Sequence, residues 1–124
     1  MQSPRPLSQL STVPELDGIL CDIDDTLTWE GRLVPESLIW LRKAREAGLR
    51  VVPVTGRPAG WADQIARLWP VDGVVGENGG LWFWMSPEGL RRGYAQDPET
   101  RKNNRNRLTR LEHRILSSVP GTGL

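Results

Sequence analysis

The sequence has few of the features that would place a chain in a specialised class. Its one cysteine, Cys21, cannot form an internal disulfide, and its apolar neighbours favour a small core residue over a reactive thiol. The 16 basic and 15 acidic residues leave a net charge of +1, which gives no general attraction to nucleic acid or to anionic membranes. No apolar run has the length of a signal peptide or of a membrane span. These absences favour a cytoplasmic protein with neither a membrane nor a nucleic acid as partner.

The size and composition of the chain fit one modest hydrophobic core. The chain has 124 residues, of which 38% are hydrophobic. We expect a flexible tail over residues 1–14 and a folded segment over residues 15–85. Beyond Ser86 the composition becomes arginine-rich, and residues 86–124 are expected to contain a basic helix.

Three short apolar stretches are typical of β-strands. Residues 18–21 are apolar throughout, which indicates a strand buried on both faces. Residues 49–54 are rich in valine, although Pro53 weakens a central position. A third strand is predicted over residues 71–75, and the strongly apolar stretch 81–85 follows it.

Two helices are predicted between these strands. Pro35 suits the first position of a helix and Gly48 its end, and the apolar residues between them recur at helical spacing. The second helix is marked by Trp61, Ile65 and Leu68 and ends at Trp69. Alternating strands and helices predict an α/β fold with a parallel sheet, whose functional groups gather at the carboxyl ends of the strands.

Polar clusters follow all three predicted strands, over residues 22–28, 55–57 and 77–80. The first crowds Asp22, Asp24 and Asp25 together, and such crowding usually serves a cation, a proton transfer or a phosphoryl group. In extended chain Asp22 and Asp24 share a face and Asp25 points away. One carboxylate of this pair can bind a cation such as Mg²⁺ and attack an electrophile, while the other transfers a proton.

The other two clusters allow both a functional and a structural interpretation. The Thr55 hydroxyl and the Gly56 amide can hold a phosphoryl oxygen, but Thr55 can equally cap the helix that follows. Arg57 suits either a site or an ordinary surface, and for Asn78 a turn beside Gly79 is the favoured interpretation. For Trp82, Trp84 and His113 we expect structural roles: packing for the two tryptophans and a solvated surface for the histidine.

These motifs resemble those of the haloacid dehalogenase (HAD) superfamily of phosphohydrolases. Asp22-Ile23-Asp24-Asp25-Thr26 is similar to its first motif, Asp-x-Asp-x-Thr, and Thr55-Gly56-Arg57 to its second. Glu77-Asn78-Gly79 resembles a stretch of the Cof-like branch, which includes sugar-phosphate phosphatases. The resemblance covers residues 16–85 and implies a HAD-like Rossmannoid parallel sheet with helices on both faces.

The resemblance also implies a role for each matching residue. Asp22 is expected to be the nucleophile that forms an aspartyl-phosphate, and Asp24 the general acid and then the base. Mg²⁺ would bind the Asp22 carboxylate and the Asp24 backbone carbonyl. Thr55 and Gly56 would hold the phosphoryl group of a small phosphorylated metabolite, such as a sugar phosphate. Arg57 and Asn78 would line the entrance.

Two parts of the family pattern have no counterpart in this sequence. The only lysines are Lys43 and Lys102, neither placed like the third-motif lysine, and no acidic pair of the fourth motif follows residue 85. We therefore expect the first half of a catalytic core over residues 15–85 and the start of a cap domain over 86–124, in a truncated chain. Such a sheet would expose an apolar edge, which favours self-association.

Three alternatives remain open. The first is a catalytically inactive HAD-like module with a binding role. A receiver-like phosphoacceptor domain is the second, although it would carry its aspartate after the third strand, where this chain has Gly76-Glu77. The third is nucleic-acid binding by the basic residues of the C-terminal segment; a solvated helix is favoured because Glu99 and Glu112 dilute the charge and no aromatic residues are interleaved. The basic residues are Arg101, Lys102, Arg105, Arg107, Arg110 and Arg114.

Overall fold

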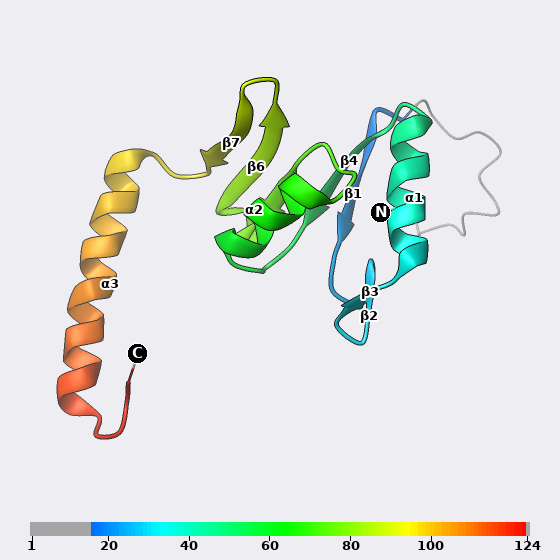
Figure 1. Ribbon diagram of the computed structural model, residues 1–124. Coiled ribbons are helices and arrows are strands. Elements are labelled where there is room, and N and C mark those ends of the chain that lie inside the picture. The colour runs from blue at the N-terminus through cyan, green and yellow to red at the C-terminus, as the bar shows by residue number, and fades with distance from the viewer. Residues whose placement is uncertain (1–15, 124) are drawn as a thin grey trace, which may run out of the picture. The chain divides into compact units, whose positions relative to one another are not determined.

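The computed structural model describes residues 16–123, which belong to two units, residues 1–93 and 94–124. The flexible tail predicted over residues 1–14 lies outside the described residues. The first unit holds the sheet and two helices, and the second holds one long helix (Figure 1).

The sheet has five strands in the order β1-β4-β5-β6-β7. Their bounds are β1 Gly18–Asp22, β4 Arg50–Val54, β5 Val74–Gly76, β6 Leu81–Ser86 and β7 Gly89–Tyr94. Strands β1, β4 and β5 are parallel, which confirms the α/β prediction. Strand β6 runs antiparallel to β5, so the sheet is mixed. The four residues between β5 and β6 are too few for the crossover that a parallel neighbour needs.

A small hairpin follows the acidic cluster. It pairs β2 (Thr28–Trp29) with β3 (Arg32–Leu33) in antiparallel fashion. The two residues between these strands, Glu30 and Gly31, both have positive φ, as the tightest hairpin turns require. The hairpin connects the end of β1 to the first helix.

Both predicted helices are present, with boundaries close to those expected. Helix α1 (Pro35–Glu46) has proline at its first position and is followed by Gly48, whose φ is 87°. Helix α2 (Ala59–Leu68) ends before Trp69. Its buried residues are Ala62, Ile65 and Ala66, whereas Trp61 and Leu68 are 50% and 69% exposed. Of the three apolar residues that marked this helix in the sequence, only Ile65 is buried, and the other two buried positions are small alanines.

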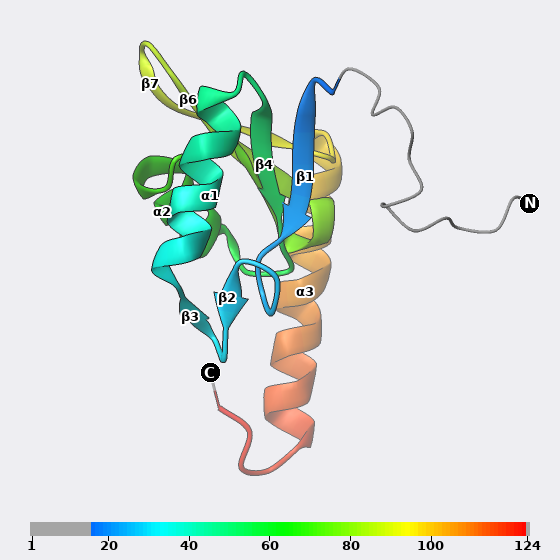
Figure 2. The same ribbon diagram turned by 90° about the vertical axis from the view of Figure 1, so that its right-hand side faces the viewer.

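The core lies between the sheet and these two helices. Helix α1 packs on β4, as Figure 2 shows, and α2 packs on β5 and β6. The buried side chains of β4, β5 and β6 alternate along each strand, as expected for one covered face: Val51, Pro53, Val74, Leu81 and Phe83. The other face carries partly or fully exposed residues, namely Leu20, Val52, Val75, Trp82 and Trp84. Helices on both faces were expected, but within residues 16–93 both helices cover the same face, because a hairpin rather than another helix follows β5.

Strand β1 is less buried than the sequence indicated. Its burial alternates, and Leu20 is 73% exposed, so the prediction of a strand buried on both faces was wrong. Among the described strands β1 pairs only with β4, which leaves it at an edge of the sheet. Apolar composition alone did not distinguish a central strand from an edge strand whose second face lies open.

Asp72 explains why the third strand begins later than predicted. The Val51 N–H donates to Asp72 Oδ2 at 2.8 Å, and the Asp72 N–H donates to the Val51 carbonyl at 2.9 Å. Arg45 of α1 pairs with the same carboxylate at 3.2 Å. These bonds take the ladder positions before β5, and the β4–β5 register begins at the pair Val54 and Val75. Pro53 has no N–H to donate, yet it lies in this interior strand and is buried.

The second unit contains helix α3, Pro98–Ser118. The Asp97 carboxylate caps it by accepting a hydrogen bond from the Thr100 N–H at 2.9 Å, and the Arg101 guanidinium lies 3.7 Å from the centre of the Tyr94 ring. None of the residues of this helix is buried, and its apolar residues Leu108, Leu111 and Ile115 are exposed. In the described part of the chain, no helix is both long enough and apolar enough to cross a membrane.

The position of α1 against β4 predicts unequal roles for two leucines of that helix. Leu41 is 0% exposed and Leu38 is 36% exposed. We expect Leu41→Ala to lower the free energy of unfolding by about 2–4 kcal/mol, because it leaves a cavity in the core. The control Leu38→Ala should cost less than about 1 kcal/mol. Urea unfolding followed by circular dichroism measures both, and equal losses would contradict this packing.

Candidate functional site

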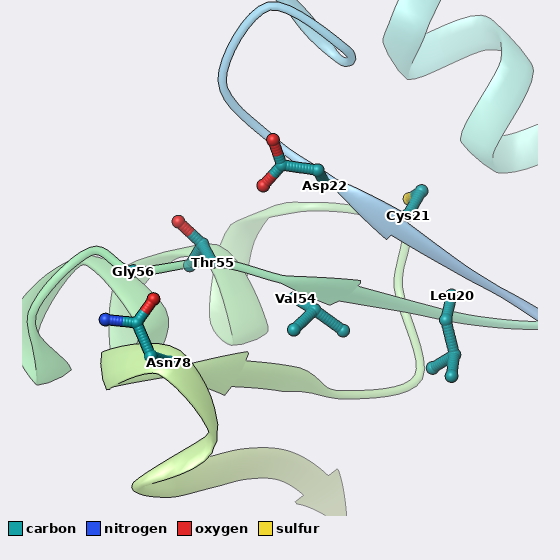
Figure 3. A pocket seen from close by; sticks show the side chains of 7 residues that line it. All are labelled: Leu20, Cys21, Asp22, Val54, Thr55, Gly56 and Asn78. Carbon is teal, nitrogen blue, oxygen red and sulfur yellow. The ribbon is translucent and has the colours of Figure 1, made fainter.

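The carboxyl ends of the three parallel strands meet at one edge of the sheet. The register places Asp22 of β1 opposite Val54 of β4, and Val54 opposite Val75 of β5. A pocket of about 320 Å³ opens at this edge (Figure 3). It is lined by Leu20, Cys21, Asp22, Val54, Thr55, Gly56 and Asn78. Four predicted site residues therefore converge here: Asp22, Thr55, Gly56 and Asn78.

The other two predicted residues, Asp24 and Arg57, do not line this pocket but pair with each other. Arg57 Nε lies 3.2 Å from Asp24 Oδ1 and 3.0 Å from Oδ2, and Arg57 Nη2 also donates to Oδ1. These hydrogen bonds favour the carboxylate form and lower the pKa of Asp24 below its ordinary value. Strand β1 ends at Asp22, so the alternation that was expected to place Asp24 on the same face does not continue.

The acidic loop is held in place by the backbone carbonyl of Ile23. This oxygen accepts hydrogen bonds from the Leu27 N–H at 2.9 Å, the Thr28 N–H at 3.0 Å and the Thr28 hydroxyl at 3.1 Å. The Thr28 oxygen in turn accepts from the Asp25 N–H at 3.2 Å. Ile23, which lies between the two candidate carboxylates, is buried together with Leu27, and these two side chains anchor the loop. Sequence reasoning did not single out Thr28, because its role depends on this local turn.

Thr55 supports the turn that follows β4. Its side chain is buried, its N–H donates to the Val75 carbonyl at 2.9 Å, and its hydroxyl oxygen accepts from the Arg57 N–H at 3.1 Å. The alternative in which Thr55 caps the following helix is wrong, because α2 begins at Ala59 after Pro58 and the Thr55 hydroxyl bonds within the preceding turn instead. A hydroxyl that accepts one hydrogen bond can still donate another, so contact with a phosphoryl oxygen remains compatible with this geometry.

Asn78 adopts the turn conformation that the sequence favoured. Its φ is 53°, in the left-handed region, and its N–H donates to the Thr55 carbonyl at 3.1 Å. A β-carbon on Gly56 would lie 3.0 Å from Asn78 Oδ1, so glycine at 56 permits this close approach. Asn78 therefore joins the turn after β5 to the turn after β4 and also faces the pocket.

Glu77 caps helix α2 from across the sheet edge. Its Oε1 accepts from the Ala59 N–H at 3.2 Å, and its own N–H donates to the Arg57 carbonyl at 3.0 Å. Its φ of 50° is uncommon for a residue other than glycine. The motif Glu77-Asn78-Gly79 did not predict this contact, which forms between residues that only the fold brings together.

Cys21 is half-buried beside the site. Burial raises the pKa of its thiol, and the nearby Asp22 charge raises it further. A raised pKa disfavours the nucleophilic thiolate. The structure therefore supports the interpretation of Cys21 as a packing residue.

The described residues contain no group of three or more histidine, cysteine, aspartate or glutamate side chains placed to hold a metal ion. The ligands predicted for Mg²⁺ are two oxygens, the Asp22 carboxylate and the Asp24 backbone carbonyl. Mg²⁺ prefers oxygen, and it is often bound through one or two carboxylates together with water and substrate phosphate. The donor chemistry thus fits part of a magnesium site.

Comparison with known proteins agrees with these motifs. Residues 19–88 match the family model of haloacid dehalogenase-like hydrolases. The chain is 44% identical over 66 residues to a phosphoglycolate phosphatase of Pyrobaculum islandicum, an alignment that covers 51% of this chain and 29% of that protein. A phosphoglycolate phosphatase of Methanobrevibacter smithii is 40% identical over 70 residues, covering 55% of this chain and 30% of that protein. The chain therefore spans less than a third of the length of these relatives.

A solved structure shows a similar fold. It is a phosphatase of the haloalkanoate (HAD) enzyme superfamily from Bacteroides thetaiotaomicron, with a TM-score of 0.50 and 23% sequence identity. The match covers 83% of this chain and 40% of that structure. At this identity the likeness supports the α/β fold.

The contact between Glu77 and α2 predicts a stabilising role for this side chain. We expect Glu77→Ala to lower the free energy of unfolding by about 0.5–2 kcal/mol, because the Ala59 N–H loses its acceptor. Glu77→Gln keeps an oxygen acceptor and should retain most of the stability. Thermal unfolding of the two variants measures the difference. Equal stability of the alanine variant and the unaltered protein would show that the cap contributes nothing.

Proposed function

Because the chain belongs to the haloacid dehalogenase-like hydrolases, we propose that it carries the nucleophile-bearing part of a phosphatase site. The observation that carries this proposal is the convergence of Asp22, Thr55 and Gly56 on one pocket at the carboxyl edge of the sheet. This edge is where α/β sheets bind their ligands. The reaction proposed is hydrolysis of a phosphomonoester through an aspartyl-phosphate.

The proposed reaction has two steps. In the first, a carboxylate oxygen of Asp22 bonds to phosphorus, the bond from phosphorus to the ester oxygen breaks, and Asp24 gives its proton to the departing oxygen. In the second, Asp24 removes a proton from water, and the resulting oxygen attacks phosphorus. This attack releases phosphate and restores the Asp22 carboxylate.

The neighbouring groups bind and orient the phosphoryl group in this proposal. The Thr55 hydroxyl and the Gly56 N–H are donors suited to its oxygens. Arg57 and Asn78 contribute a cation and an amide near the entrance. Asp22 and the Asp24 backbone carbonyl would hold Mg²⁺, whose charge lets an anionic nucleophile approach an anionic phosphate.

The proposed substrate is a small phosphorylated metabolite in the cytoplasm. The similarity to proteins named phosphoglycolate phosphatase makes phosphoglycolate the first substrate to assay, and sugar phosphates are the second class. Neither a membrane nor a nucleic acid is part of the proposal.

A second candidate function is binding without turnover. It is favoured by the only two lysines of the sequence, because Lys43 on α1 does not line the pocket and Lys102 belongs to the second unit. In that case the division predicted from sequence, a core over 15–85 and the start of a cap over 86–124, would describe a module that retains phosphate binding only.

Replacement of the nucleophile separates the two functions. We expect the unaltered chain to hydrolyse phosphoglycolate or an aryl phosphate with Mg²⁺ present, and Asp22→Asn to reduce the rate about 1000-fold or more, because the attacking carboxylate is lost. Asp25→Asn removes an equal charge three positions away and should retain activity. Phosphate release measures the rates. A folded, unaltered chain that binds phosphate without turnover would favour the binding module.

Self-association is proposed through the edge of the sheet. Strand β1 has a neighbour on one side only among the strands between residues 16 and 123, and its Leu20 is exposed. An unpaired strand edge beside an exposed apolar side chain is a template for pairing with another chain. The proposed partner at β1 is a second copy of this chain.

Charge placed on β1 should weaken this association. We expect Leu20→Lys to shift the chain toward monomer in sedimentation velocity measured over a range of concentrations, because lysine on an edge strand opposes pairing. Leu68→Lys is a matched control, since Leu68 is also exposed but lies at the end of α2. A monomeric unaltered chain, or an equal response of both variants, would rule out association through β1.

A further inference from the structure

The Arg57 guanidinium lies between two side chains that were not expected to meet it. On one side it donates to both carboxylate oxygens of Asp24. On the other, its carbon lies 4.5 Å from the centre of the Trp61 ring. Trp61 marked the second helix in the sequence, and in the structure this side chain is half-exposed. Its contact with Arg57 gives this tryptophan a role other than core packing.

We propose that Arg57 exchanges partners, binding Asp24 in the free protein and a phosphate anion in the occupied site, with Trp61 as the positioning residue that supports it in both states. This inference rests on the proposed function, because the anion is the phosphoryl group of that site. It adds a release of Asp24 that is coupled to substrate binding.

The chemistry of the two partners makes the exchange possible. A guanidinium group presents parallel N–H donors that match carboxylate and phosphate oxygens equally well. The Asp24 and Arg57 side chains are 47% and 25% exposed, so water and a dissolved anion can reach the pair. A phosphate dianion carries more charge than the single carboxylate and competes for the same donors.

The backbone confines the exchange to the Arg57 side chain. The Arg57 N–H donates to the Thr55 hydroxyl at 3.1 Å, and the Arg57 carbonyl accepts from the Glu77 N–H at 3.0 Å. Arg57 also directly follows Gly56, which lines the pocket. Its main chain is therefore held beside the anion site, and only rotation about side-chain bonds is needed.

Trp61 limits where the guanidinium can go. An aromatic face attracts a cation without using its N–H donors, so Arg57 remains able to bind either anion while it is stacked. Phenylalanine also offers such a face, whereas alanine does not. The pair Trp61→Phe and Trp61→Ala thus separates stacking from other effects of the side chain.

A double-mutant cycle tests the exchange by titration of the full chain with inorganic phosphate in a calorimeter. Asp24→Asn removes the competing partner, so we expect phosphate to bind about three-fold more tightly, the gain expected from loss of a part-exposed ion pair. Asp25→Asn removes the same charge one residue away and should leave the affinity within about two-fold. In the background of Arg57→Ala, Asp24→Asn should give no gain.

The tryptophan variants complete the test. Trp61→Ala should weaken phosphate binding about two- to three-fold through loss of the stacking contact, and Trp61→Phe should retain it. Thermal unfolding of each variant confirms that the compared chains are folded. Loss of affinity in both tryptophan variants would contradict support by an aromatic face.

The outcomes distinguish this inference from the function on which it rests. If the unaltered chain binds phosphate but Asp24→Asn and Asp25→Asn tighten binding equally, the effect is one of net charge and the exchange is wrong. A gain from Asp24→Asn that persists with Arg57→Ala also overturns it. If the unaltered chain binds no phosphate, the exchange fails, and the hydrolysis assay with Asp22→Asn decides the proposed function separately.

Discussion

The parallel pairing of β1 with β4 is the constraint on which the site depends. It sets Asp22 opposite Val54, so that Thr55, the next residue, begins its turn beside the candidate nucleophile. A slip of this register by one residue would move every side chain of β1 to the opposite face of the sheet. The hydrogen bond from the Thr55 N–H to the Val75 carbonyl then aligns the end of β4 with β5. The pocket therefore follows from strand pairing before any loop is considered.

The loops at this edge stabilise one another. The turn after β5 donates two backbone hydrogen bonds to the turn after β4, from Glu77 to the Arg57 carbonyl and from Asn78 to the Thr55 carbonyl. The Glu77 carboxylate also accepts a hydrogen bond from the start of α2. Two consecutive residues in the left-handed region, Glu77 and Asn78, are part of this arrangement. Such strain persists only where surrounding contacts fix the backbone. The stretch Glu77-Asn78-Gly79 after β5 therefore stabilises the neighbouring turns, and its Asn78 also lines the pocket.

The features that could be predicted from sequence are those set by nearby residues. Pro35 and Gly48 mark the ends of α1, and the polar clusters mark the ends of strands, so the convergence of Asp22, Thr55, Gly56 and Asn78 could be expected. Which face of a strand or helix is buried could not be predicted, because burial depends on which other elements cover that face. Leu20, Trp61 and Leu68 are apolar yet exposed for this reason. The pairing of Asp24 with Arg57 was also beyond sequence reasoning, since it joins side chains 33 positions apart.

The Asp24–Arg57 pair constrains how the two steps of the proposed reaction can be ordered. With Arg57 bound, the pKa of Asp24 is lowered, so the carboxyl group is ionised and can accept a proton but has none to give. This state suits removal of a proton from water in the second step. Donation to the departing oxygen in the first step requires a protonated Asp24, which this contact opposes. Loss of the Arg57 hydrogen bonds would remove the cause that lowers the pKa of Asp24, which is the direction that proton donation requires, and their return would again favour the carboxylate that acts as base.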